Sequence, residues 1–286
     1  MPDCTLQAMT NKLLIEKRAD GVTILTFNRP ETRNALDLET MQAFRDTVDG
    51  LAHEPSLRAL IITGAGQDAF CSGGDLIELS GYPSEAEARN MIALMGNALL
   101  KLEGLTVPVI AAINGYALGG GSEVAMACDL RIADASARMA FVQIRMGLTP
   151  GWGAGQRLLR LVGYSRALEF LLSGKVMQGA ELATAGLVNQ VVEAGNALAH
   201  ALNMAEQIAT SPPDAVRGIK ALLQTGMYLP YEQALQFERD IFPRLWASDA
   251  HLQAVERFLN RNNPLTSTPL PQGARGKDKS LRTESE

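Results

Sequence analysis

The chain has 286 residues, of which 47% are hydrophobic and 20% charged, so it is long and apolar enough to bury a large core. Its formal net charge of −5, without a long run of Lys or Arg, lacks the electrostatic footprint of a protein that binds nucleic acid or an anionic membrane. No segment reaches the roughly 18 apolar residues of a membrane helix, and residues 1–7 lack the features of a signal peptide, so we expect a cytoplasmic protein.

Short apolar runs alternate with helical patterns over the first two thirds of the chain, which is typical of an α/β protein. A short polar lead precedes the first strand, and a turn at 18–21 joins the first two strands. Strands are predicted at 13–17, 21–27, 60–64, 109–113, 130–133, 139–141 and 187–192. Helices are predicted from the cap Asp37 to before Pro55 and at 85–102, 156–161, 165–172 and 179–185.

The pattern from residue 196 onward is helical, with four helices that end near residue 260. These helices carry too many apolar residues to be a solvated appendage, among them Leu222, Met227, Phe237 and Trp246, so we expect them to assemble subunits. Residues 266–286 are rich in Pro, Gly, Ser, Lys and Glu and are predicted to be disordered. The predicted organisation is a strand-helix core at 12–195, a helical oligomerisation region at 196–262 and a tail at 266–286.

The three cysteines and three histidines are not spaced as local metal ligands. There is no C-x₂-C or H-x₃-H pattern, so we expect no metal site. The cysteines are Cys4, Cys71 and Cys128, and an odd number without close pairing is typical of small buried thiols in a reducing compartment. A Ser–His or Cys–His catalytic pair stays open, although no motif supports one.

The stretch from 108 to 129 is the centre of the prediction. A buried strand, a turn at 114–115 and three glycines lead into a helix that we expect to begin near Glu123. Glycines without a Cβ let the backbone approach a ligand, and a helix N-terminus leaves N–H groups free to donate to an oxygen that gains negative charge. Glu123 beside such donors suits proton transfer next to a carbonyl that becomes an enolate.

Close packing, a phosphate site and simple complementation of the helix dipole are the alternative interpretations of this stretch. The spacing matches neither G-x-G-x-x-G nor G-x-S-x-G. A second glycine site supports the catalytic interpretation. In the loop 65–75, the Gly74 N–H is predicted to face a ligand and Asp75 to cap a short helix, although a plain turn with an N-cap also fits.

Three segments, at 28–36, 69–76 and 111–123, resemble the signature segments of the crotonase (enoyl-CoA hydratase/isomerase) superfamily. The resemblance covers residues 12–262. It implies an α/β fold of the crotonase-like (ClpP/crotonase) type, a spiral of repeated ββα units with a helical C-terminal trimerisation region. It also implies a homo-trimer or hexamer and an acyl-CoA thioester substrate, with coenzyme A as part of the substrate and no further cofactor.

Carried over residue by residue, the resemblance places the two N–H donors of an oxyanion hole on Gly74 and Gly120. Glu123 matches the first of the two acids that hydratases of the family use. Near these residues we predict a substrate-binding set made of Asp75, Leu76, Gly119, Gly121 and Trp152.

The second acid of the hydratases has no counterpart in this sequence. Counting back four residues from Gly147 reaches Gln143, and a shorter intervening segment would place Arg145 there instead. Neither residue is a carboxylic acid, whereas hydration needs a base to activate water and an acid to protonate carbon. Either residue could instead orient a departing carboxylate.

Segments at 141–153, 212–220 and 234–246 are similar to the ethylmalonyl-CoA decarboxylase branch of the superfamily, which decarboxylates 2-carboxyacyl-CoA thioesters. One acid suffices there, because the enolate forms as CO₂ leaves and needs only a returned proton. The resemblance therefore leaves three alternatives: a decarboxylase, an enoyl-CoA hydratase or isomerase, and a non-catalytic RNA-binding relative. The acidic balance and the presence of Glu123 argue against the third.

Overall fold

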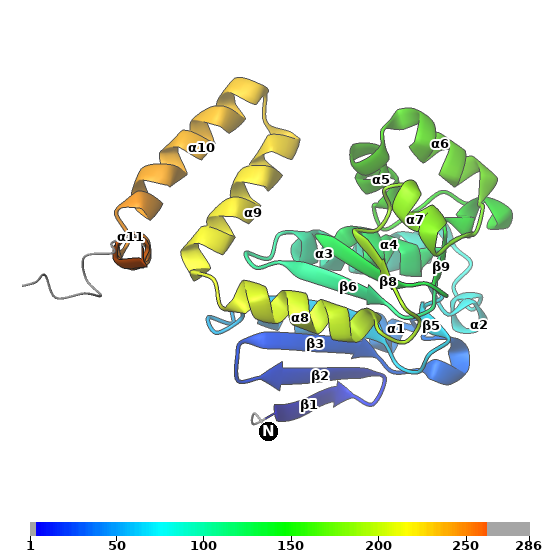
Figure 1. The fold of residues 1–286 in the computed structure, drawn as a ribbon. Helices are drawn as coiled ribbons and strands as arrows, with labels where there is room; N and C mark the ends of the chain where they lie inside the picture. Colours follow the sequence, from blue (N-terminus) through cyan, green and yellow to red (C-terminus); the bar gives the residue numbers. More distant parts are fainter. Residues whose placement is uncertain (1–3, 262–286) are drawn as a thin grey trace, which may run out of the picture. The chain divides into compact units, whose positions relative to one another are not determined.

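A seven-stranded sheet is the largest layer of the computed structural model, which describes residues 4–261 (Figure 1). Its strand order is β1-β2-β3-β4-β6-β8-β11, with antiparallel pairing from β1 to β3 and parallel pairing from β3 to β11. The strands are β1 (Cys4–Thr10), β2 (Leu13–Arg18), β3 (Val22–Phe27), β4 (Ala59–Gly64), β6 (Val109–Ile113), β8 (Leu130–Asp134) and β11 (Gln190–Val192).

A second sheet of short strands has the order β10-β9-β7-β5. Its strands are β5 (Ala69–Cys71), β7 (Tyr116–Leu118), β9 (Arg138–Ala140) and β10 (Met177–Gln178). Strands β5, β7 and β9 follow β4, β6 and β8 along the chain, and each is followed by helix, so the chain repeats a ββα unit. This repeat confirms the predicted fold class.

The helices after these strands supply the rest of the core unit. They are α1 (Leu38–Leu51), α2 (Leu76–Leu79), α3 (Glu85–Glu103), α4 (Gly120–Ala127), α5 (Ala154–Val162), α6 (Tyr164–Ser173) and α7 (Ala180–Thr184). Helix α1 begins where Asp37 caps it, as predicted, because the Asp37 carboxylate accepts from the Thr40 N–H.

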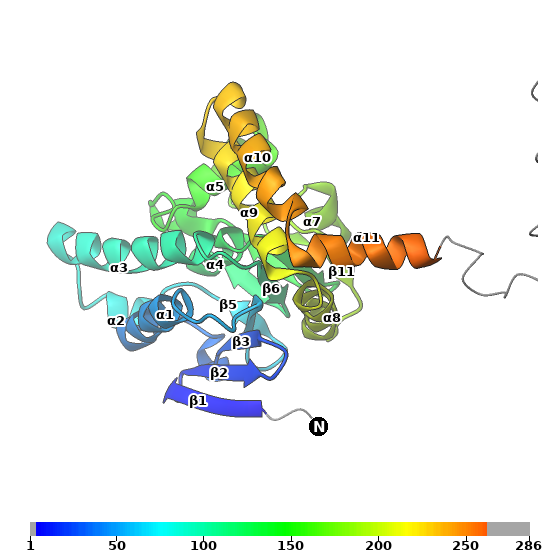
Figure 2. The same ribbon diagram turned by 90° about the vertical axis from the view of Figure 1, so that its left-hand side faces the viewer.

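Hydrophobic residues cover both faces of the large sheet. One face packs on α1 and α3, while α8 (Ala197–Ala209) lies along the other (Figure 2). Helix α8 presents Ala197, Ala201 and Ala205, spaced four residues apart, to the strand residues Ile61 and Ile110. Burial on both faces explains why the central strands are continuous apolar runs rather than alternating ones.

The remaining helices are α9 (Pro213–Tyr228), α10 (Tyr231–Trp246) and α11 (Asp249–Arg261). The chain divides into two compact units, one ending at Tyr231 and one beginning at Glu232. In the first unit, the buried Lys220 of α9 donates to the Val107 carbonyl at 2.9 Å and pairs with Asp129 at 2.7 Å, so α9 is fastened to the core. In the second unit, the rings of Trp246 and His251 lie 4.5 Å apart.

Most predicted elements are present, and the differences are short or polar strands. The predicted polar lead contains β1, and the predicted loop 65–75 contains β5. Strand β7 was also missed, and the last predicted strand shortens to β11. The missed strands β5, β7 and β10 are three residues long or fewer, too short to show a period. The tail at 266–286 lies outside the described residues, and none of the described helices is long and apolar enough to cross a membrane.

Candidate active site

The two predicted glycine loops lie side by side. Strands β5 and β7 pair in parallel, so the loops that follow them leave the sheet at the same edge. Gly73 has a φ of +100°, and a Cβ placed on it would lie 3.0 Å from the Gly120 nitrogen and 3.1 Å from the Leu118 carbonyl oxygen. Only a glycine lets the loops approach so closely in this conformation.

The Gly74 N–H is turned outward by pairing with the segment that precedes α1. Leu36 donates to the Gly73 carbonyl at 2.8 Å, and Asp75 donates to the Leu36 carbonyl at 2.9 Å. Because successive groups in extended backbone alternate in direction, the N–H of Gly74 faces away from Leu36. It donates to no other group within residues 4–261.

The Gly120 N–H begins α4 and, like that of Gly74, has no acceptor in the described part of the chain. Its loop is fixed by close packing. A Cβ on Gly121 would lie 1.9 Å from the Cys71 carbonyl oxygen, and a Cβ on Gly120 would lie 2.2 Å from the Trp152 ring. The Gly119 N–H donates to the Ala140 carbonyl at 2.9 Å.

Glu123 lies in the first turn of α4, as predicted, and is 3% exposed. Its carboxylate accepts four hydrogen bonds. Oε1 accepts from the Gln143 side-chain amide at 3.0 Å and the Gly151 N–H at 3.2 Å, and Oε2 accepts from the N–H groups of Trp152 at 2.7 Å and Ala154 at 3.1 Å. The turn before α5 and its first residue therefore form a nest for the carboxylate anion. Proton transfer at either oxygen requires one donor to be shared or displaced.

Gln143, and not Arg145, contacts Glu123. Donation from the Gln143 Nε2 to the carboxylate orients the amide, so Oε1 is its free end. That oxygen is buried and has no partner among the described residues. Arg145 instead donates to the Gly174 carbonyl at 2.8 Å.

The remaining predicted residues differ in their surroundings. Asp75 caps α2 through its Oδ1 and pairs with Arg29 through its Oδ2. The Leu76 side chain is 63% exposed beside it. Trp152 is buried, with its ring against Gly120. No group of three or more His, Cys, Asp or Glu within the described residues could hold a metal ion.

The contacts that support the turn that binds Glu123 were not predicted from the sequence. The Arg157 guanidinium donates to the Trp152 carbonyl at 2.8 Å and to the Glu103 carboxylate at 3.0 Å. The other Glu103 oxygen accepts from the Tyr228 hydroxyl at 3.0 Å, and Gln224 donates to the Glu103 carbonyl, so α9 contributes to this support. The signal was a third glycine-rich loop before a helix, at 147–155, the same pattern that marked the other two loops.

The chain was compared with known protein families, curated proteins and solved structures, and the results agree with these loops, their order and the ββα repeat. The sequence profile of the family described as enoyl-CoA hydratase/isomerase matches residues 17–267. The chain belongs to this family. It is 35% identical over 251 residues to the short-chain-enoyl-CoA hydratase of Clostridium acetobutylicum, which covers 88% of this chain and 95% of that protein.

Two further relatives bear on the reaction and the fold of this enoyl-CoA hydratase/isomerase family member. The ethylmalonyl-CoA decarboxylase of Gallus gallus is 33% identical over 246 residues, which covers 85% of this chain and 82% of that protein. The crystal structure of an enoyl-CoA hydratase from Bacillus anthracis superposes with a TM-score of 0.81 at 32% identity, covering 90% of this chain and 96% of that one. The hydratase is the more similar of these two curated relatives and the decarboxylase the more distant one, so the comparisons show the family and leave the reaction open.

Proposed function

We propose that the protein decarboxylates a 2-carboxyacyl-CoA thioester of the ethylmalonyl or methylmalonyl type. The observation that carries the proposal is the contact between Gln143 and Glu123. The resemblance puts the second acid of the hydratases at Gln143 or Arg145, and of these two residues it is Gln143, an amide, that donates to Glu123. A site with one carboxylate can return a proton to an enolate but has no second carboxylate to activate water.

In this reaction the bond between Cα and the carboxylate breaks, and CO₂ leaves. The electron pair moves into the thioester, whose oxygen becomes the enolate oxygen and accepts from the N–H groups of Gly74 and Gly120. Loss of one such donor typically lowers the rate about 10²–10³-fold. Protonated Glu123 then donates its proton to Cα and becomes the carboxylate, which takes up a proton from solvent before the next turnover, and Gln143 holds Glu123 in place.

Enoyl-CoA hydration or isomerisation is the second candidate, because the Clostridium relative is named a hydratase. Isomerisation also needs only one carboxylate, which removes a proton from one carbon and returns it to another. Both alternatives use the same enolate and the same two N–H donors, so the identity of the substrate distinguishes them.

The test is to incubate the protein with ethylmalonyl-CoA, methylmalonyl-CoA and crotonyl-CoA and to follow the mass of each thioester. We expect loss of CO₂ from a carboxyacyl-CoA and slow hydration of crotonyl-CoA. Gln143→Glu should reverse this preference, since two carboxylates about 4 Å apart repel by about 4 kcal/mol at an effective dielectric constant of about 20. Gln143→Met, which has similar length and no charge, controls for loss of the amide. Fast hydration of crotonyl-CoA by the wild type without release of CO₂ would establish the hydratase alternative.

We also propose that the protein assembles as a homo-trimer or hexamer. The apolar side chains of α5, α6 and α9 that face outward support this assembly: Leu161, Tyr164, Leu172, Ile219, Leu223 and Met227 are at least 42% exposed. A monomer mass by light scattering at micromolar concentration would contradict it.

A further inference from the structure

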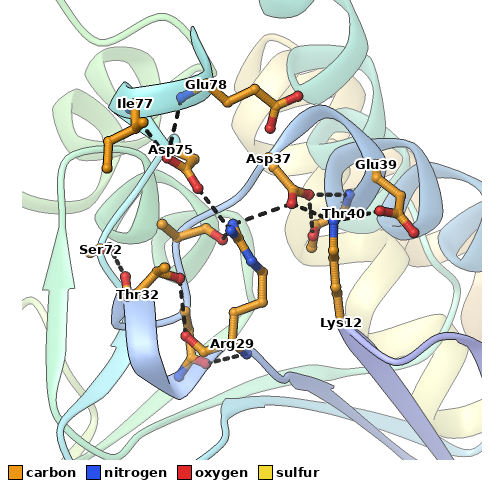
Figure 3. Close-up of polar contacts among 12 residues, drawn as sticks. Lys12, Arg29, Thr32, Asp37, Glu39, Thr40, Ser72, Asp75, Ile77 and Glu78 are labelled. Atoms are coloured by element: carbon orange, nitrogen blue, oxygen red, sulfur yellow. Dashed lines mark hydrogen bonds and ion pairs between the residues drawn. The ribbon is translucent and has the colours of Figure 1, made fainter.

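Arg29 joins the caps of two helices (Figure 3). Its guanidinium lies 2.9 Å from the Asp75 Oδ2 and 3.4 Å from the Asp37 Oδ2, and it donates to the Ala35 carbonyl at 2.8 Å. The three charged side chains are 15%, 12% and 6% exposed for Arg29, Asp75 and Asp37. Ion pairs so shielded from water are stronger and more specific in geometry than surface pairs.

Each aspartate divides its two oxygens between two tasks. The Oδ1 of Asp37 accepts from the Thr40 N–H at 2.8 Å, and the Oδ1 of Asp75 accepts from the Ile77 N–H at 3.2 Å, so these oxygens cap α1 and α2. The Oδ2 of Asp75 pairs with Arg29, and the Oδ2 of Asp37 is shared between Arg29 and Lys12, whose Nζ lies 2.7 Å from it. Arg29 therefore adds nothing to the caps themselves and instead sets the position of one cap relative to the other.

The segments that Arg29 connects are the two that present Gly74. Ala35, which accepts from Arg29, precedes Leu36, and Asp75, which pairs with Arg29, follows Gly74. Leu36 and Gly74 form the parallel bridge that turns the Gly74 N–H outward. Arg29 thus fixes both sides of this bridge.

The charge of Arg29 has a second effect. Asp75 follows directly after the residue that is proposed to donate to the enolate oxygen, and an unpaired carboxylate there would repel the negative charge that develops. The guanidinium next to Asp75 offsets that charge. The repulsion between Asp75 and the thioester oxygen grows as that oxygen gains charge, so it is stronger in the transition state than in the bound substrate. Its compensation by Arg29 should therefore raise kcat and leave KM nearly unchanged.

We propose that Arg29 is a positioning residue, which together with Asp75 aims the Gly74 N–H at the thioester oxygen and compensates the Asp75 charge. The proposal rests on the proposed function only in requiring a CoA thioester at this site. It is independent of whether the thioester is decarboxylated, hydrated or isomerised.

The chain offers a matched pair of variants for the test. Asp75→Asn and Asp37→Asn each keep an oxygen that can cap a helix, and each removes one carboxylate from Arg29; Asp37→Asn also removes the carboxylate that pairs with Lys12. Only Asp75 adjoins Gly74. We expect Asp75→Asn to lower kcat about 10- to 100-fold with KM nearly unchanged, less than the loss of a whole donor, and Asp37→Asn to lower the Tm while kcat stays within about twofold. Equal effects of the two variants on kcat, or an effect of Asp75→Asn on Tm alone, would overturn the proposal.

A spectroscopic readout separates this proposal from the identity of the reaction. Butyryl-CoA labelled with ¹³C at its carbonyl has neither a carboxylate nor a double bond, so it binds without reacting. Its carbonyl stretching frequency should fall on binding to the full-length wild type, because N–H donors polarise the carbonyl. Arg29→Gln should lose most of this shift, and Arg29→Lys, which keeps the charge without the planar fork, should keep part of it.

The outcomes are distinguishable. A full frequency shift in Arg29→Gln and in Asp75→Asn would overturn the role of Arg29 and leave the proposed function standing. Absence of a frequency shift in the wild type would instead show that Gly74 and Gly120 do not form an oxyanion hole, and it would contradict the proposed function. If Arg29→Gln does not fold, Asp75→Asn tests the positioning role, because it breaks the ion pair that aims the Gly74 N–H, and Arg29→Lys, which keeps the charge next to Asp75, tests the compensation.

Discussion

The loop around Gly74 and the loop around Gly120 hold their N–H groups in different ways. Gly74 is held through its neighbours, because the Gly73 carbonyl and the Asp75 N–H hydrogen-bond to Leu36 and Asp75 forms an ion pair with Arg29. Gly120 is held by close packing, with its α-carbon against the Trp152 ring and the next residue against the Cys71 carbonyl. The position of the Gly74 N–H therefore depends on an ion pair, and the position of the Gly120 N–H depends on the space left by small residues. Different substitutions should displace each donor.

The largest effect is expected from adding one methyl group to the packed loop. In Gly121→Ala, the new Cβ meets a backbone oxygen at 1.9 Å, and β5 must move to relieve the clash. We expect a loss of about 3 kcal/mol or more in the free energy of unfolding. Gly96→Ala in α3 is the control, because nothing lies within 4 Å of its Cβ, and its stability should be unchanged or slightly higher. Urea denaturation of both variants measures the difference.

Glu123→Gln tests the same region, because Glu123 lies in the first turn of α4, close to Gly120 and Gly121. Each Glu123 oxygen accepts two hydrogen bonds, and an amide has only one acceptor oxygen, so its NH₂ group must face N–H donors. We expect turnover to be abolished and stability to fall by about 1–3 kcal/mol. Kinetics and thermal melting measure the two effects. A variant that keeps more than about a tenth of the wild-type rate would remove Glu123 from proton transfer.

A direct contrast comes from placing alanine at each donor glycine. In Gly120→Ala the Cβ meets the rigid Trp152 ring at 2.2 Å, whereas in Gly74→Ala it meets the end of the Leu79 side chain at 2.7 Å, which can rotate away. We expect Gly120→Ala to lose about 1–3 kcal/mol of stability as well as activity, and Gly74→Ala to keep its Tm within a few degrees. Equal destabilisation of the two variants would show that both loops are packed alike.

The smallest effect is expected on the pH dependence of stability, through Asp37, one of the two carboxylates that contact Arg29. Burial raises the pKa of Asp37, but hydrogen bonds from Lys12 and Thr40 outweigh burial and lower that pKa below its ordinary value. A lowered pKa in the folded state stabilises the fold above the pKa of the unfolded chain, about 3.9, and this stabilisation is lost as pH falls through the folded pKa. Asp37→Asn should therefore be less stable than the wild type at pH 7, and the difference should shrink below about pH 4. Melting curves between pH 3 and 7 measure it.

The parts of the fold that were predictable are those with a repeating pattern. Continuous apolar runs marked the central strands, and the glycine clusters marked both loops and Glu123. The donors around Glu123 were not predictable, because they are backbone N–H groups of residues such as Trp152 and Ala154, whose side chains do not encode that role. The ion pair of Arg29 with Asp75 was missed for another reason, since nothing in the sequence relates two residues so far apart until the fold brings them together.

The contact between α9 and the turn that binds Glu123 has a consequence for biosynthesis. Tyr228 and Gln224 reach Glu103, which holds Arg157 and through it the carbonyl of Trp152. A ribosome makes these α9 residues long after it has made both glycine loops and Glu123. Because domains fold progressively from the N-terminus during synthesis, we expect a nascent chain to complete the support of this turn only when α9 has emerged. The growing polypeptide would then lack a complete support for Glu123 until the ribosome has translated α9.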